Sequence, residues 1–330
     1  MTSGRVRIDS VGRYLPSTVV TAAELENRMQ LPAGWIARKT GVLERRWVNG
    51  ESPLEMALAA CNDAFGRSTL APEDVDLIIY AAATPHQILP DSASLLQREL
   101  GLGASGVKAF SVHSTCLSFI TALDLAAMYI AAGSHHNVLI ATAEISSIAI
   151  DFTHPESASL LGDMATAVLV TEAPTYSSSS MRSYVFRTYG DHADLCRVEA
   201  GYAKHPLMPS TKDEDYLFHM EGPEIFRAAY RLFPPVIAEA LGSAGVAIED
   251  LGAVVPHQAS MLAVRSIQRA LGVRDDQIVM NIDRVGNCVA ASIPGAMFDG
   301  IASGQIKRGD TVLLAGTGAG LSLAACVLEW

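Results

Sequence analysis

The sequence has too few cysteines, too widely scattered, for a fold held together by disulfide bonds. Its five cysteines are Cys61, Cys116, Cys196, Cys288 and Cys326, and no two of them form a CxxC pair. An odd, scattered set argues against a disulfide framework and gives no zinc-binding pattern. We therefore expect reduced thiols, as in the cytoplasm, and no metal site.

Long apolar runs and an excess of positive charge are also missing. The apolar stretches at 75–83 and 311–315 are far shorter than the roughly 18 residues that a membrane-spanning helix needs. The first residues, MTSGRVRIDS, lack the apolar core of a secretory signal. A net charge of −11 disfavours nucleic acid and anionic membranes as partners, because both attract basic surfaces. These absences predict a soluble cytoplasmic protein.

The chain does contain enough apolar sequence for a large core. Of its 330 residues, 49% are hydrophobic and 18% are charged, which is the balance of a compact globular protein. A single core of this size is uncommon, so the length favours two structural units.

The strongest pattern is a repetition of the first half of the chain in the second. The matching pairs are 95–102 with 266–273, 107–133 with 278–304, and 137–144 with 311–318. The first two pairs are separated by the same shift of 171 residues, and the third follows a short insertion. Repetition at a constant shift indicates a duplicated structural unit.

The repeated segments also indicate the architecture. Runs such as LIIYAAA and VLIATA are apolar on both faces, which is typical of sheet strands covered by helices on both sides. We predict an α/β fold of two layered αβαβα units related by a pseudo-twofold axis, with the units at 1–175 and 176–330. Equivalent loops are then expected to face each other at the centre.

Three residues fall on the turns that this duplication brings together: Cys116, His257 and Asn287. At the shift of 171 residues Cys116 matches Asn287, and His257 ends the strand of VVPHQ. Each alone has a plainer interpretation, as a packed thiol, a strand-end histidine or a turn residue. Together, a thiol, an imidazole and a carboxamide are the groups of a thiolate-based acyl-transfer site.

The position of Cys116 favours catalysis. The helix predicted at 119–132 begins just after it, and the positive field of a helix N-terminus predicts a lowered thiol pKa. His257 and Asn287 can donate hydrogen bonds to the enolate formed when a malonyl thioester loses CO2. The backbone N–H groups of Cys116 and of the turn GTGAGLS at 316–322 are expected to bind the oxyanion of acyl transfer.

These motifs resemble a known family. SVHSTCLSF, VVPHQAS, NIDRVGNCVAAS and GTGAGLSLAACVLEW are similar to the ketoacyl-acyl carrier protein synthase III branch of the thiolase superfamily. GWIARKTGVLERRW resembles the substrate-mouth segment of that branch, and LGDMATAVLV resembles its Gly-Asp element. The resemblance covers essentially the whole chain. It implies a thiolase-like fold and the decarboxylative condensation of an acyl group with a malonyl thioester.

The resemblance also implies roles for individual residues. Cys116 would accept the acyl group, His257 and Asn287 would support decarboxylation, and the amides of Cys116 and Ala319 would form the oxyanion hole. The implied substrate- and coenzyme A-binding residues are Trp35, which would stack on the adenine, and Lys39, Phe226, Ala259 and Ser260. The implied partners are acyl-coenzyme A or acyl carrier protein thioesters and a second copy of the chain, with no cofactor.

The chain departs from the family pattern at the substrate mouth. Leu262 and Pro155 stand where the family has arginines, and Lys39 replaces a third. Ala319 is the middle residue of a turn that usually has three glycines. A lysine keeps the charge but lacks the fork that binds phosphate in two places. We therefore expect weaker recognition of coenzyme A and a specialised acyl donor, such as a carrier-bound one, in specialised metabolism.

Other functions stay open on the sequence alone. An acyltransferase of the same fold would pass the acyl group to an alcohol or an amine, and a related enzyme would condense two acyl thioesters without decarboxylation. A non-catalytic ketosynthase-like subunit would normally lack the nucleophile, whereas Cys116 is present. The acyl chain is undetermined, because the loops at 86–92 and 194–210 are expected to set the depth of the pocket.

The remaining cysteines and one nearby histidine are expected to be structural. Cys61 and Cys326 lie in apolar runs, and the side chain of Cys288 is expected to point away from the site. His113, three residues before Cys116, is expected to be buried.

Overall fold

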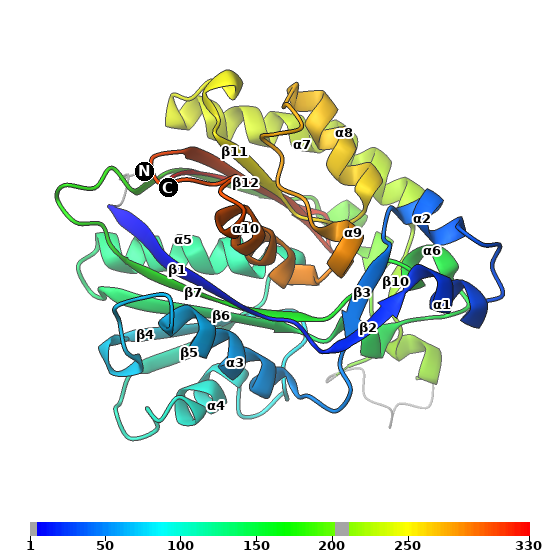
Figure 1. The fold of residues 1–330 in the computed structure, drawn as a ribbon, viewed down its shortest axis with the longest axis horizontal. Helices are drawn as coiled ribbons and strands as arrows, with labels where there is room; N and C mark the ends of the chain where they lie inside the picture. Colours follow the sequence, from blue (N-terminus) through cyan, green and yellow to red (C-terminus); the bar gives the residue numbers. More distant parts are fainter. Residues whose placement is uncertain (1–4, 202–210) are drawn as a thin grey trace.

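Two β-sheets form the framework of the molecule (Figure 1). The computed structural model describes residues 5–201 and 211–330. Within these residues the first sheet runs in the order β1 (Val6–Tyr14), β7 (Met164–Glu172), β6 (Asn137–Glu144), β4 (Leu77–Ala81) and β5 (Lys108–Val112). The second runs in the order β11 (Ala253–Pro256), β12 (Thr311–Gly318), β13 (Ser322–Glu329) and β8 (Ser180–Thr188).

The two sheets have the same plan. In the first, β4 pairs in parallel with β5 and β6, and β7 pairs antiparallel with β6 and β1. In the second, β11 pairs in parallel with β12, and β13 pairs antiparallel with β12 and β8. A parallel bridge between Val254 and Ile278 takes the place of β5. The predicted duplicated α/β fold is confirmed, whereas the division at residue 175, in the connection between β7 and β8, stays a prediction.

Helices cover both sheets and fill the space between them. α3 (Pro53–Phe65) and α4 (Ser92–Glu99) pack on the outer face of the first sheet, and α7 (Gly222–Ala244) and α8 (Met261–Leu271) pack on that of the second. α5 (Ser118–Ala131) and α10 (Ser292–Ala302) lie between the sheets (Figure 1). No helix in the described part of the chain has the length and apolar character needed to span a membrane.

The alternation of side chains along the strands explains the apolar runs in the sequence. In β4, Leu77 and Ile79 join the core that contains α5 and α10. Ile78 and Tyr80 point to the other face and join the core under α3 and α4. A strand buried on both sides must be apolar at every position, which is why it shows no polar alternation.

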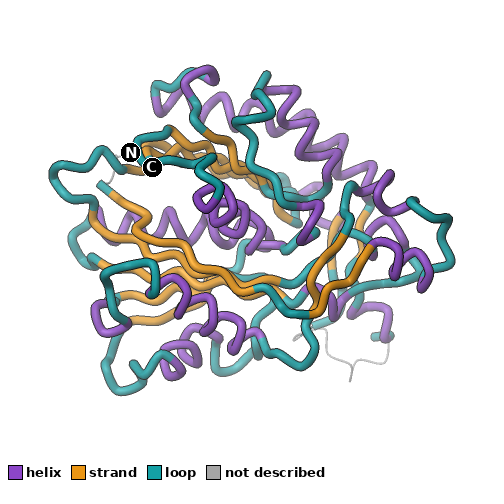
Figure 2. The backbone as a smooth tube through the Cα atoms, in the orientation of Figure 1, coloured by secondary structure: helices purple, strands orange, loops and turns teal. Residues whose placement is uncertain are grey.

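Shorter elements gather at one end of the sheets, on the right of Figure 2. They are β2 (Thr18–Thr21), α1 (Ala22–Arg28), α2 (Trp35–Thr40), β3 (Glu44–Trp47), α6 (Pro155–Ala158), β9 (Cys196–Arg197), β10 (His219–Met220) and α9 (Ile282–Val285). β2 pairs with β3, and β9 pairs with β10. Several of these elements form the entrance to the site described next.

Candidate active site

One cavity of about 950 Å³ opens among several of the short elements, one face of α8 along its length and the part of α7 up to Ile237. Cys116, His257, Asn287 and Ala319 all line this cavity. They come from four connections, namely β5 to α5, β11 to α8, α9 to α10, and β12 to β13. The structure therefore brings together the side chains that the sequence selected, while their chemical roles stay a prediction.

The turn that carries Cys116 has a counterpart in the second half, but the counterpart is not centred on Asn287. A short 3₁₀ turn, Thr115–Leu117, leads into α5, and the turn Val289–Ala291 leads into α10. Thr115 and Val289 have matching positive φ values of 51° and 50°. Ala290 thus occupies the place of Cys116. The predicted match to Asn287 is wrong by three residues, because α10 has 11 residues and α5 has 14.

The thiol of Cys116 does not have the lowered pKa that its helix predicted. α5 begins two residues later, at Ser118, and burial raises the pKa of the thiol. Cys196 and Glu144 raise it further, while the backbone N–H groups of Ala319 and Cys116 lower it. The prediction was wrong in direction because desolvation of a sulfur anion outweighs the field of a helix terminus. The resting group is a neutral thiol with two N–H donors beside it.

His257 is held at the end of β11 with little freedom. Its backbone N–H donates to the carbonyl of Ala315 at 2.7 Å, and only 4% of the residue is exposed. A Cβ on Gly316 would lie 2.8 Å from that of His257, so the glycine is needed for this close packing. Burial lowers the pKa of the imidazole to about 4, and Nδ1 has no hydrogen-bond partner among the described residues. The ring is therefore neutral near pH 7 and carries a single N–H donor.

Asn287 is fixed so that its amide nitrogen is free to donate. Its Oδ1 accepts a hydrogen bond from the backbone N–H of Val289 at 2.9 Å. Because the oxygen is occupied, the NH2 group is the part of the carboxamide left for a ligand. The segment containing Asn287 and Cys288 continues into a turn whose Cys288 thiol is buried and donates to the carbonyl of Val285 at 3.3 Å. The expectation that Cys288 points away from the cavity is therefore confirmed.

The backbone of Asn287 also joins the two halves of the chain. Its N–H donates to the carbonyl of Leu160 at 2.7 Å, and its carbonyl accepts from the N–H of Gly162 at 3.0 Å. This contact is possible because neither Gly162 nor Gly286 has a side chain. A Cβ on Gly162 would lie 2.0 Å from the carbonyl oxygen of Val285, and one on Gly286 would lie 2.5 Å from that of Leu160. We call this pair the glycine junction.

The turn that carries Ala319 is packed against the cysteine turn. Thr115 donates through Oγ1 to the carbonyl of Ala319 at 3.4 Å, and a Cβ on Gly318 would lie 2.7 Å from that Oγ1. The N–H of Ala319 points instead to the sulfur of Cys116, as its effect on the thiol pKa indicates. The methyl group of Ala319 thus leaves the donor in place.

The predicted substrate-binding residues divide into two groups. Lys39, Phe226, Ala259 and Ser260 line the cavity. Trp35 is the first residue of α2 and does not line it, but the ammonium of Lys39 lies 6.0 Å from the centre of its ring. Its predicted stacking on adenine stays a prediction.

Basic side chains at the cavity entrance have acidic partners. Lys39 pairs with Glu156 at 3.5 Å, and Arg197 pairs with Glu199 at 2.6 Å. Leu262, where the resemblance led us to expect an arginine, is 55% exposed. The nearby Arg265 pairs with Asp275 at 2.8 Å. A phosphate group would have to compete with carboxylates for these cations.

Sequence reasoning did not select three groups close to Cys116. Cys196, in β9, lines the cavity, and burial raises the pKa of its thiol to about 12. His113 also lines it and is exposed, so the expectation of a buried residue was wrong. No pattern marked Cys196, but the place of His113 just after β5 was visible. The rest of the loop 194–210, at 202–210, lies outside the described residues.

Glu144, the last residue of β6, is the third of these groups. It is fully buried and accepts hydrogen bonds from the N–H groups of Ala83 and Thr84 at 2.8 and 3.0 Å and from the Thr84 hydroxyl at 2.7 Å. Ala83 and Thr84 line the cavity, so Glu144 shapes its wall. Burial raises the pKa of this carboxyl to about 7, although its hydrogen bonds oppose the rise.

We predict that Glu144 makes stability depend on pH. Its pKa is about 7 in the folded protein and 4.5 when unperturbed, so its contribution is fully present below 4.5 and is lost as the pH rises through 7. Relative to Glu144→Gln, the free energy of unfolding of the unchanged protein should fall by about 3 kcal/mol between about pH 5 and about pH 8. Denaturant titrations of both proteins measure this. Parallel pH profiles would contradict it.

Comparisons with known proteins agree with this geometry. The family model "3-Oxoacyl-[acyl-carrier-protein (ACP)] synthase III" matches residues 110–190, and its C-terminal counterpart matches residues 241–330. Beta-ketoacyl-[acyl-carrier-protein] synthase III of Aquifex aeolicus is 36% identical over 327 residues, which cover 98% of this chain and 99% of that protein.

Solved structures give the same result. The crystal structure of 3-oxoacyl-[acyl-carrier-protein] synthase III from Aquifex aeolicus has a TM-score of 0.90 at 34% identity and covers 98% of this chain and 100% of its own. The priming beta-ketosynthase from the R1128 polyketide biosynthetic pathway has a TM-score of 0.90 at 27% identity and covers 99% of this chain and 96% of its own. Fold, order of motifs and similarity along the whole chain agree. The chain belongs to the 3-oxoacyl-[acyl-carrier-protein] synthase III family of condensing enzymes.

Proposed function

We propose that the protein loads an acyl group onto Cys116 and condenses it with a malonyl thioester, with loss of CO2. The observation that carries this proposal is the shared cavity, which holds a thiol with two N–H donors together with the donors of His257 and Asn287. Its relatives are named for ketoacyl synthesis, and a nucleophile beside a pair of donors that can bind an enolate suits that chemistry.

In the first step the sulfur of Cys116 attacks the carbonyl carbon of the acyl thioester. The oxyanion accepts hydrogen bonds from the N–H groups of Cys116 and Ala319, which already point at the sulfur. The donor thiol then leaves as the bond to its sulfur breaks. Because the resting Cys116 is neutral, its proton is transferred during the step and ends on the departing thiol.

In the second step the bond between C2 and the carboxylate of the malonyl thioester breaks, and its electrons remain on C2 as an enolate. The enolate oxygen accepts hydrogen bonds from His257 and from the NH2 group of Asn287. The neutrality of His257 suits it to donate, and its pKa of about 4 keeps it neutral throughout the physiological range. C2 then attacks the acyl carbonyl, and the sulfur of Cys116 leaves.

We further propose that the acyl donor is specialised. Exposed Leu262 and the acidic partners of Lys39, Arg197 and Arg265 leave few unpaired cations near the entrance for a coenzyme A phosphate. The R1128 relative is a priming enzyme of polyketide synthesis, which supports a role outside the common fatty-acid starter. The donor is therefore a carrier-bound acyl thioester of specialised metabolism, used in the cytoplasm.

A panel of acyl thioesters tests the whole proposal. The protein is incubated with each donor, the mass of the acylated chain is measured, and malonyl thioester is then added. We expect an acyl adduct on Cys116, followed by CO2 and a β-ketoacyl product. An adduct that yields no CO2 but gives an ester or amide with an alcohol or amine would identify an acyltransferase. Product without CO2 from two acyl thioesters would identify the non-decarboxylative reaction.

We also propose that the protein is a homodimer formed through the edge strand β5. Among the described strands β5 pairs only with β4. Beside it, the loop at 86–91 is tied by a 2.7 Å hydrogen bond between Ser111 and Asp91, and it exposes Ile88 and Leu89 to 53% and 74%. An open edge next to exposed apolar side chains is typical of a surface covered by a second copy.

A dimer formed through this surface should dissociate when charged side chains are introduced into the loop at 86–91. We expect the unchanged protein to have twice the chain mass by light scattering, and the double variant Ile88→Asp, Leu89→Asp to have the mass of one chain. Tyr176→Asp is the matched control, because Tyr176 is 87% exposed in the connection between β7 and β8. A double variant with unchanged mass would contradict the proposed interface.

A further inference from the structure

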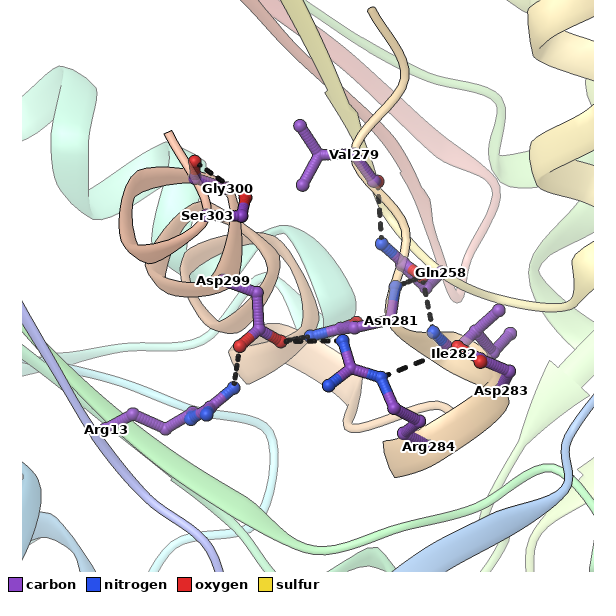
Figure 3. A network of polar contacts seen from close by, with 10 residues as sticks. All are labelled: Arg13, Gln258, Val279, Asn281, Ile282, Asp283, Arg284, Asp299, Gly300 and Ser303. Carbon is purple, nitrogen blue, oxygen red and sulfur yellow. Dashed lines mark hydrogen bonds and ion pairs between the residues drawn. The ribbon is translucent and has the colours of Figure 1, made fainter. Parts of the chain in front are cut away.

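Gln258, the residue after His257, joins two parts of the active site through its side chain (Figure 3). It is completely buried. Its Nε2 donates to the carbonyl of Val279 at 3.1 Å, and its Oε1 accepts from the backbone N–H groups of Asn281 and Ile282 at 3.1 and 2.9 Å. These hydrogen bonds connect the end of β11 to the segment 279–282.

The segment 279–282 leads directly to Asn287. Ile282 begins α9, which ends at Val285, and Gly286 and Asn287 follow. The side chain of Gln258 therefore connects the turn that carries His257 to the segment that leads into the turn of Asn287. No other hydrogen bond from a side chain joins these two segments among the described residues.

A charged cluster holds this segment from the opposite side. Asn281 donates through Nδ2 to Asp299 at 2.8 Å, and Asp299 pairs with Arg13 at 2.7 Å and with Arg284 at 3.6 Å. Asp299 is on α10 and Arg13 is on β1, so the cluster links the segment to the first half of the chain (Figure 3). The segment is thus held between Gln258 and the body of the protein.

We propose that Gln258 is a positioning residue that keeps the donors of His257 and Asn287 at the spacing at which both reach one enolate oxygen. This inference rests on the proposed decarboxylation. A carboxamide supplies, from two different atoms, the donor for Val279 and the acceptor for two N–H groups. Glutamate keeps the acceptor and loses the donor, and methionine loses both and leaves buried N–H groups without partners. Among the described residues, the side chain of Gln258 makes its hydrogen bonds to Val279, Asn281 and Ile282 and none to the turn that carries Cys116, so acylation does not depend on it directly.

The test separates the two steps of the reaction. In Gln258→Met we expect CO2 release from malonyl thioester to fall by about 100-fold, because a small displacement of a catalytic group has an effect of that order. Acylation of Cys116, measured by intact mass, should be unchanged. The rate of CO2 release by Gln258→Glu should lie between those of Gln258→Met and the unchanged protein. This variant also tests the inference if the methionine variant does not fold.

Gln277 provides a matched control in the same half of the chain. It is also buried and also bridges two segments, since Nε2 donates to the carbonyl of Leu251 at 2.5 Å and Oε1 accepts from the N–H of Arg274 at 3.1 Å. Gln277→Met should lower the melting temperature but leave CO2 release unchanged. Equal loss of CO2 release in both methionine variants, or no loss in Gln258→Met, would overturn the inference. If His257→Ala and Asn287→Ala release CO2 normally, the proposed function itself fails.

Discussion

Replacing Cys116 by alanine is expected to abolish acylation and to lower the rate of condensation by on the order of 10⁴-fold or more, as for the loss of a catalytic nucleophile. The sulfur is the only group of the protein that forms a bond to the acyl carbon in the proposed mechanism. Release of CO2 from malonyl thioester should persist, because His257 and Asn287 stay in place. Intact mass spectrometry and CO2 measurement separate these two results.

The control for Cys116→Ala is a variant of the second thiol in the cavity, Cys196. Cys196 lines the same cavity, and it is close enough to affect the pKa of Cys116. Cys196→Ala should retain the acyl adduct. If the adduct instead persists in Cys116→Ala and disappears in Cys196→Ala, the nucleophile has been assigned to the wrong cysteine.

Asn287→Asp should have the next largest effect. Aspartate keeps an oxygen for the N–H of Val289, so the turn is preserved. It replaces the NH2 donor by a second oxygen, which repels a developing enolate. Loss of one such donor lowers the rate of a reaction by about 10²–10³-fold. We expect this decrease in CO2 release, with normal acylation of Cys116.

The matched variant for this position is Asn281→Asp. Asn281 lies in the segment that leads to Asn287, but its side chain donates to Asp299 rather than into the cavity. Its replacement should reduce thermal stability through repulsion between two carboxylates, with a smaller effect on CO2 release. A normal rate of CO2 release in Asn287→Asp would show that Asn287 has no direct part in the reaction.

The fold was predictable because the sequence contains the same structural unit twice. The matched segments at 95–102 and 266–273 fall on α4 and α8, and the repeated apolar runs fall on strands with the same pairing. The register of the central turns was not predictable. Sequence matching followed the C-terminal ends of α5 and α10, where glycines recur, whereas three residues are missing nearer their N-termini.

The sequence predicted which residues form the site better than it predicted the pKa values of those residues. The resemblance and the repeat selected Cys116, His257 and Asn287 correctly as neighbours of one cavity. The direction of the pKa of Cys116 depends on how much water reaches the sulfur, which no local pattern records. Glu144 was missed for the same reason, since an acidic residue that ends a strand looks like a surface residue until the loop that covers it is placed.

The glycine junction has an evolutionary consequence. Asn287 belongs by sequence to the second half of the chain, but its main chain is bonded to residues 160–162 of the first. A change in the first half that admits a different acyl group would therefore move the carboxamide of Asn287 together with the sulfur of Cys116. The two chemical steps can remain aligned while the substrate changes, and the halves cannot diverge as independent modules.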